Sequence, residues 1–130
     1  MKKYLSILTI MILCSSSSVF ANNIAVVDLQ KIVSNSSQVK QLKQEHAKKI
    51  AELDKIIVNA RGEISNEKDP AKVLLLEDKY MNEFNTKREA LERDYNSRLA
   101  NIEKNIKTEI TQKAQKDKYD YVFAKSVLLY

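Results

Sequence analysis

The sequence predicts a mostly α-helical protein with a small β body that further subunits complete. The first observation is a nearly unbroken helical pattern from Asp69-Pro70 to about Lys118. The second is an amphipathic stretch from Gln38 to Asn66. The third is a pair of short β-branched and aromatic regions, one before and one after these helices. A helix of this length needs a partner helix or another subunit, because it would extend on the order of 70 Å.

The N-terminal residues 1–21 have the pattern of a signal peptide. Lys2 and Lys3 precede an apolar run from Leu5 to Leu13, and small residues end at Ala21. We expect cleavage after Ala21, which leaves residues 22–130 as one domain. A membrane anchor is disfavoured because the apolar run is shorter than the ~20 residues that a bilayer span needs. A lipoprotein acylated at Cys14 is disfavoured because bulky Leu13 precedes it.

Composition argues against most catalytic chemistry. The chain has one His, one Gly and one Cys, and the cysteine, Cys14, lies in the expected signal peptide. Metal clusters, Ser–His or Cys–His catalysis and a Gly-rich phosphate loop therefore lack the residues they need. We expect neither an enzyme nor a cofactor. Cleavage would also remove Lys2 and Lys3 and lower the formal net charge from +5 to +3, which together with export argues against a nucleic-acid partner.

The middle of the chain predicts an antiparallel helical hairpin over residues 38–118, with its tip near 67–70. Asp69 suits an N-cap, and Pro70 suits the first helical position. Folding the chain there pairs residues whose numbers sum to roughly 137, such as Leu53 with Phe84. In the last helix apolar residues recur every eleven positions, which indicates a nearly straight helix. Its last third should pack on the body through Ile102, Ile106 and Ile110.

Residues 22–37 and 119–130 are expected to form the body. The run from Ile24 to Asp28 predicts a strand. Asp28 can cap a short helix from Leu29 to Val33, and Ser36 or Ser37 can cap the helix that follows. Two further strands are expected, Tyr119 to Ala124 and Val127 to Tyr130. These strands cannot bury both faces of a sheet alone, so other subunits must complete it. The candidate body and oligomer residues are Ile24, Val26, Tyr121, Phe123, Val127 and Leu129.

Several apolar residues near the tip lie off the predicted helix–helix seam. Successive helical residues are about 100° apart, so the run from Val73 to Leu76 cannot face one partner helix. These side chains either wrap their own turn or offer weak contacts to unfolded client polypeptides. The candidate client-contact residues are Ile56, Val58, Leu74, Leu75 and Met81. Lysines and arginines along the helices alternate with acids, which indicates a solvated face or a weak contact with anionic lipid or another envelope component.

The chain resembles the Skp, or OmpH-like, family of periplasmic chaperones. The resemblance rests on the signal peptide, the opening from Ile24 to Ile32, the long helical hairpin and the stretch from Tyr119 to Ala124. It implies a homotrimer with a β-barrel body and three helical arms around a cavity. It further implies a periplasmic holdase that keeps unfolded outer-membrane proteins from aggregating without ATP. Family members continue past the last strand with an Asp-Ile-Thr segment and a closing helix, whereas this sequence ends at Tyr130.

Two alternatives remain at the level of sequence. One is a structural coiled-coil spacer or stalk of the cell envelope, which has arms but no client. The other is a truncated, inactive fragment that does not assemble. The terminal strands distinguish the first from a chaperone, because a spacer needs no β body. The oligomeric mass of residues 22–130 distinguishes the second, because a chaperone of this kind would be a trimer and an inactive fragment a monomer.

Overall fold

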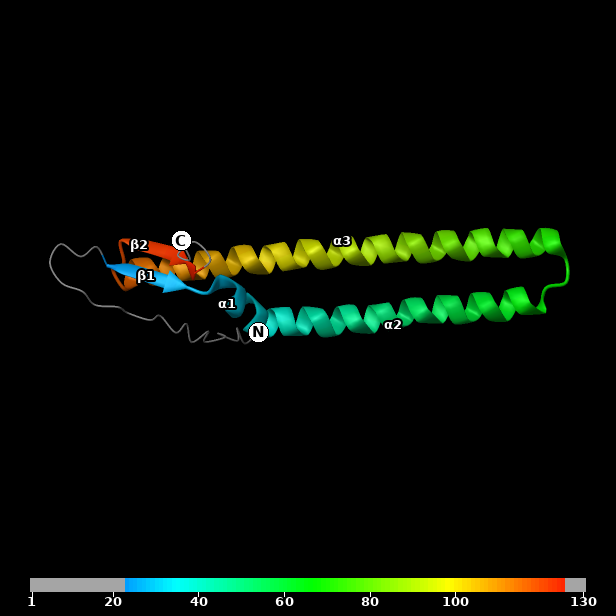
Figure 1. Cartoon of the computed structure of the whole chain (residues 1–130), viewed down its shortest axis with the longest axis horizontal. Coiled ribbons are helices and arrows are strands. Elements are labelled where there is room, and N and C mark those ends of the chain that lie inside the picture. Colours follow the sequence, from blue (N-terminus) through cyan, green and yellow to red (C-terminus); the bar gives the residue numbers. More distant parts are fainter. Residues whose placement is uncertain (1–22, 126–130) are drawn as a thin grey trace, which may run out of the picture. The chain divides into compact units, whose positions relative to one another are not determined.

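The computed structural model describes residues 23–125, which are mostly helical. In chain order the elements are β1 (Ile24–Val27), α1 (Leu29–Asn35), α2 (Ser37–Asn66), α3 (Pro70–Lys116) and β2 (Tyr121–Ala124) (Figure 1). The chain forms two compact units. The sheet unit contains the described residues up to Lys40 together with those from Asn101 onward, and the two-helix unit contains Gln41–Ala100. The predicted combination of long helices and a small sheet is confirmed at this level.

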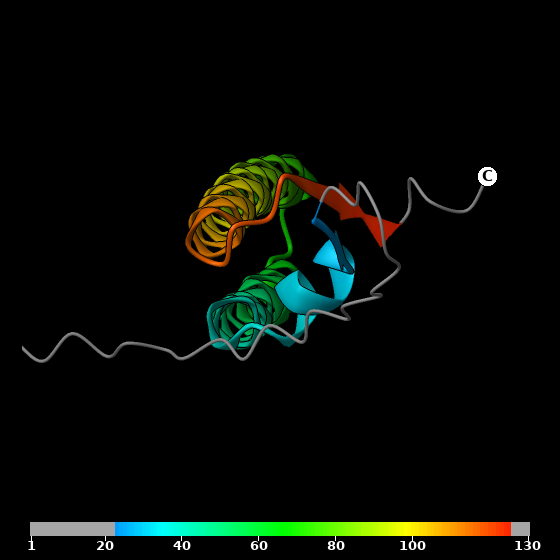
Figure 2. The ribbon, with the colours of Figure 1, turned by 90° about the vertical axis from the view of Figure 1, so that its left-hand side faces the viewer.

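In the sheet unit, β1 and β2 pair in parallel and lie side by side (Figure 2). Ile24 is opposite Tyr121, and Val27 is opposite Ala124. Ala25 and Val27 alternate with less buried residues and are themselves buried, as a strand with one covered face requires. The third expected strand, Val127 to Tyr130, lies outside the described residues.

The first helices of the sheet unit begin at side-chain caps. The carboxylate of Asp28 accepts a hydrogen bond of 3.0 Å from the backbone N–H of Lys31 and caps α1. The hydroxyl of Ser36 accepts one of 3.1 Å from the N–H of Val39 and donates one of 2.9 Å to the carbonyl of Val33. Ser36, which is buried, is therefore the cap of α2, and the alternative Ser37 is its first residue.

The connection between α2 and α3 has the helix cap and the helix start that the sequence predicts. The carboxylate of Glu67 accepts from the backbone N–H groups of Lys68 and Asp69, at 2.9 and 3.0 Å. The carboxylate of Asp69 accepts from the N–H of Ala71 at 3.0 Å. Pro70 is the first residue of α3, where its missing N–H leaves no partner unsatisfied. The predicted cap and helix start are both confirmed.

The end of α3 differs from the prediction. The helix ends at Lys116, and Lys118 has a positive φ of 60°. The N–H of Lys118 donates to the carbonyl of Gln115, and that of Tyr119 donates to the carbonyl of Ala114. This is a Schellman motif, which usually carries glycine where Lys118 stands. β2 begins at Tyr121 and not at Tyr119, because the N–H of Tyr119 is bonded to the end of α3. The N–H groups of Asp120 and Tyr121 both donate to the carbonyl of Asn23, which precedes β1.

Within the two-helix unit, α2 and α3 are joined by ion pairs and a thin apolar core. Leu42, Leu53 and Leu91 are its buried apolar residues. Ion pairs connect Glu45 to Arg98 at 2.8 Å, Lys49 to Asp94 at 3.5 Å and His46 to Glu92 at 3.6 Å, the last when His46 is protonated.

These contacts depart from the predicted pairing sum at Glu45 and agree with it at His46. The numbers of Glu45 and Arg98 sum to 143 and those of His46 and Glu92 to 138, against the roughly 137 expected. Side chains lean toward the N-terminus of their own helix. In an antiparallel pair the side chains of the two helices therefore lean in opposite directions. Two side chains that meet then have residue numbers with a larger sum than two backbone positions that face each other.

Candidate binding surface of the two-helix unit

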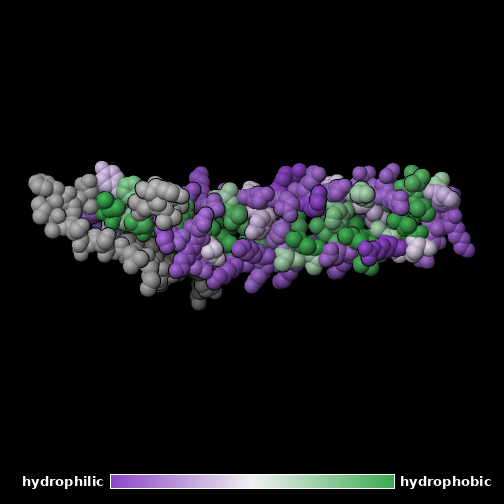
Figure 3. Space-filling model, viewed as in Figure 1, coloured by the Kyte–Doolittle hydropathy of each residue, from purple (hydrophilic) through white to green (hydrophobic). Residues whose placement is uncertain are grey.

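Large apolar side chains are exposed on both helices near the Glu67–Asp69 turn. Val58 on α2 is 66% exposed, and Leu74, Leu75 and Met81 on α3 are 63%, 69% and 62% exposed. Ile56, the fifth candidate client-contact residue, is half-buried. Figure 3 shows hydrophobic surface interrupted by hydrophilic surface over this part of the chain. Four of the five candidates are therefore open to solvent in the structure.

The exposure of these side chains follows from helical geometry. Val73 and Leu76 are half-buried, whereas Leu74 and Leu75 between them are exposed. Four consecutive helical residues point in directions about 100° apart, so one partner helix covers only part of the run. Within the described residues, nothing covers the remaining two.

A groove of about 510 Å³ lies between α2 and α3 beside these residues. Its apolar lining comes from Ile57 and Ile64 on α2 and from Tyr80 and Phe84 on α3. Met81 and Ile56 also contribute to it, together with the charged side chains of Arg61 and Glu77. The pairing rule, in which residue numbers sum to roughly 137, places Ile57 opposite Tyr80 and Leu53 opposite Phe84 in a closed seam. It does not predict that the seam opens into a groove here. No sequence signal separates a closed seam from an open one.

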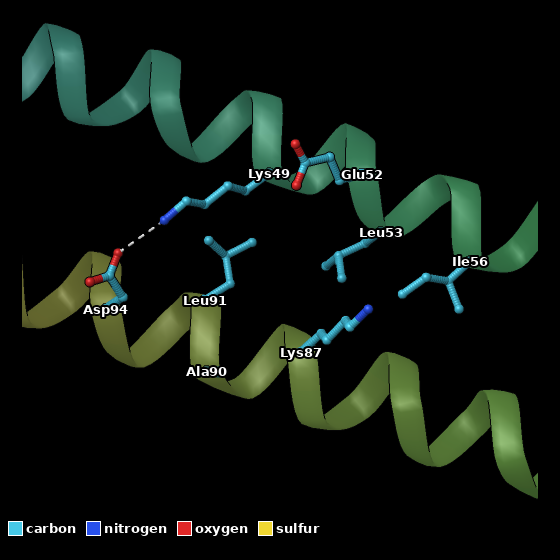
Figure 4. Close-up of a pocket in the computed structure, with 8 residues that line it drawn as sticks. All are labelled: Lys49, Glu52, Leu53, Ile56, Lys87, Ala90, Leu91 and Asp94. Carbon is cyan, nitrogen blue, oxygen red and sulfur yellow. Dashed lines mark ion pairs between the residues drawn. The ribbon is translucent and has the colours of Figure 1, made fainter.

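A second groove, of about 380 Å³, lies farther from the turn and also receives Ile56 (Figure 4). Leu53 from α2 and Leu91 from α3 point into the space between the helices. Lys49 and Asp94 form an ion pair at one end, and Lys87 reaches toward α2 near Leu53. The two grooves together give this unit an apolar strip with charged margins.

Charged side chains lie close to Tyr80 of the first groove and next to it along α3. The carboxylate of Glu63 on the facing helix, with burial as a smaller cause, raises the pKa of Tyr80. The ammonium of Lys79 lies 5.0 Å from the centre of the Tyr80 ring, within cation–π range. Lys87 hydrogen-bonds Glu83 at 2.8 Å and lowers the pKa of that carboxyl.

His46, the single histidine, lies between the helices. Its ring centre is 4.4 Å from that of Tyr95, and its Nε2 is buried without a hydrogen-bond partner. The pairing rule, in which residue numbers sum to roughly 137, places it opposite Leu91, whereas the structure places it against Tyr95 and Glu92. These are contacts of a packed seam residue. In residues 23–125 no group of three or more His, Cys, Asp or Glu could hold a metal ion.

The candidate body residues share one face of the sheet. Strand alternation and the parallel register place Ile24, Val26, Tyr121 and Phe123 on the same side. Ile24 and Tyr121 are exposed, and Val26 and Phe123 are half-buried. The rings of Tyr121 and Phe123 stack with centres 6.1 Å apart. Val127 and Leu129, the other two candidates, lie outside the described residues.

None of the helices between residues 23 and 125 is long and apolar enough to cross a membrane. Compared with protein-family models and with curated proteins, the chain has no match.

Proposed function

We propose that this protein is an ATP-independent periplasmic holdase that binds unfolded outer-membrane proteins and prevents their aggregation. The observation that carries the proposal is the exposure of Val58, Leu74, Leu75 and Met81 beside an apolar groove. A soluble surface rarely gathers apolar side chains in this way unless they meet a partner. The signal peptide pattern and the resemblance to the Skp family supply the compartment and the client class.

The mechanism follows from the kind of contact that this surface offers. Each exposed side chain buries little client area, so each contact is weak and reversible. Several such contacts on one helical arm, and several arms in one assembly, would act together through high effective concentration. Holding apolar client segments in this way prevents them from meeting each other, which is how aggregation begins.

The sheet supports the assembly part of the proposal. An isolated two-stranded sheet has marginal stability, and the shared face of Ile24, Val26, Tyr121 and Phe123 is apolar and partly open. We propose that three copies join their strands into a common β-barrel body from which the two-helix units project as arms.

The test is suppression of client aggregation by the chain that begins at Asn22. An unfolded outer-membrane protein is diluted from denaturant and its light scattering is followed with and without this chain. We expect scattering to fall in its presence and to return in the variant L74S/L75S/M81S. The matched control, N82S/T86S, changes exposed polar residues on the same helix and should protect like the parent. Unchanged client aggregation with the parent chain would contradict the proposal.

The alternative of a structural spacer draws on a different observation, the 47 uninterrupted residues of α3. A spacer needs length but no client surface. It would leave client aggregation unchanged, and the serine variant would behave like the parent chain.

A further inference from the structure

The exposed apolar residues of α3 surround two carboxylates. Glu77 and Asp78 follow Leu74 by three and four positions and precede Met81 by four and three. Residues at these spacings are neighbours on a helix surface. Leu75 stands three positions before Asp78 and closes the group. We call Leu74, Leu75, Glu77, Asp78 and Met81 the acidic–apolar face of α3.

Neither carboxylate of this face forms an ion pair within residues 23–125. The ion pairs made by acidic residues of α3 begin at Glu83, which bonds Lys87. The nearest cation in sequence, Lys79, directs its ammonium over the ring of Tyr80, which belongs to the groove. Glu77 and Asp78 are both exposed. The face therefore presents negative charge next to open apolar surface, although the whole chain has a formal net charge of +5.

We propose that the acidic–apolar face captures cationic amphipathic segments of unfolded polypeptides. Apolar side chains of the segment contact Leu74, Leu75 and Met81, while its lysines or arginines lie near Glu77 and Asp78. This inference rests on the proposed holdase function and names the segments that the surface prefers. An acidic segment could make the same apolar contacts, but its carboxylates would be repelled.

The size of the preference follows from the exposure of the charges. Ion pairs at exposed sites are weak, and two of them together correspond to a change in affinity of about fivefold. Such a preference should fade with salt, because the Debye length falls to ~3 Å at 1 M ionic strength. The apolar contribution should not fade with it.

The first experiment uses three fluorescent peptides of equal length in which leucine alternates with lysine, glutamine or glutamate. Anisotropy titrations with the chain from Asn22 should rank them lysine, then glutamine, then glutamate. At low salt we expect the lysine peptide to bind about fivefold more tightly than the glutamine peptide. At about 1 M salt we expect the two affinities to be nearly equal. Equal affinities at low salt, or tighter binding of the glutamate peptide, would overturn the proposal.

The second experiment assigns the preference to this face. The variant E77Q/D78N should bind the lysine and glutamine peptides equally and keep the parent's affinity for the glutamine peptide. The control E103Q/E109Q removes two carboxylates from the same helix away from the face and should keep the full preference. A preference that survives in E77Q/D78N would overturn the proposal.

The aggregation assay separates this inference from the proposed function. If the parent chain suppresses aggregation but ranks the peptides equally, the charge preference is wrong and the holdase function stands. If the parent chain neither suppresses aggregation nor binds any of the peptides, both are wrong.

Discussion

At the scale of single residues, a few polar side chains decide where the helices begin and end. Asp28, Ser36 and Asp69 each accept a hydrogen bond from a backbone N–H in the first turn of a helix. These caps are readable from sequence because Ser and Asp have the short oxygen-bearing side chains that the position needs. The C-terminal end of α3 is not readable, because Lys118 stands where the usual signal would be glycine.

Lys118→Gly should therefore stabilise the protein. Glycine adopts a positive φ without the steric cost that lysine pays, although it also gains freedom in the unfolded chain. We expect the free energy of unfolding to rise by about 0.5–1 kcal/mol, measured by urea denaturation followed by helix circular dichroism. Lys116→Gly, in the last turn of α3, is the control and should lower stability. A loss of stability in Lys118→Gly would show that the Schellman motif does not form.

At the scale of elements, ion pairs connect α2 to α3 beside a thin apolar core. Few apolar residues of the two-helix unit are buried, and Glu45 bonds Arg98 at 2.8 Å between the helices. Hydrogen bonding to Arg98 lowers the pKa of Glu45 below its ordinary value of 4.5. A lowered acid pKa contributes stability that is present above the ordinary pKa and is lost as pH falls through the lowered one.

Glu45→Gln should accordingly flatten the acid side of the pH–stability profile. Thermal unfolding midpoints measured at intervals from pH 6 down to about 2 should fall less in this variant than in the parent chain. Glu52→Gln is the control, because Glu52 is an exposed carboxylate of the same helix and makes no ion pair within the described residues. Parallel profiles for the parent chain and Glu45→Gln would mean that the Arg98 pair does not persist in solution.

At the scale of the whole molecule, the sheet and the apolar surface both stay partly open to solvent within residues 23–125. The two described strands expose apolar side chains, and the apolar surface of the two-helix unit has no cover within residues 23–125. In the proposed assembly, other copies of the chain cover the open face of the sheet, and clients cover the apolar surface of the two-helix unit. The two surfaces should therefore respond to different substitutions.

Light scattering of the chain from Asn22 should give the mass of a trimer. Phe123→Glu places a charge on the shared sheet face and should shift the mass toward that of a monomer, because the charge would be buried on assembly. L74S/L75S/M81S should leave the mass of the assembly unchanged. A monomeric parent chain would favour the inactive fragment, and loss of assembly in the serine variant would place the oligomer contact on α3.

The sequence by itself determined the elements. Apolar spacing indicated both long helices, Asp69-Pro70 placed the break between them, and the β-branched and aromatic run ending at Ala124 indicated a strand. These features are local, since they depend on residues within a few positions of each other. The same locality identified Val58, Leu74, Leu75 and Met81 as residues that one partner helix could not cover.

Only the tertiary structure decided how distant residues meet. It set the parallel pairing of Ile24 with Tyr121, the shift in register that brings Glu45 to Arg98, and the opening of the seam into a groove at Tyr80 and Phe84. Each depends on the direction in which a side chain leaves its backbone and on what lies across from it. That information belongs to pairs of segments, and no single segment of the sequence contains it.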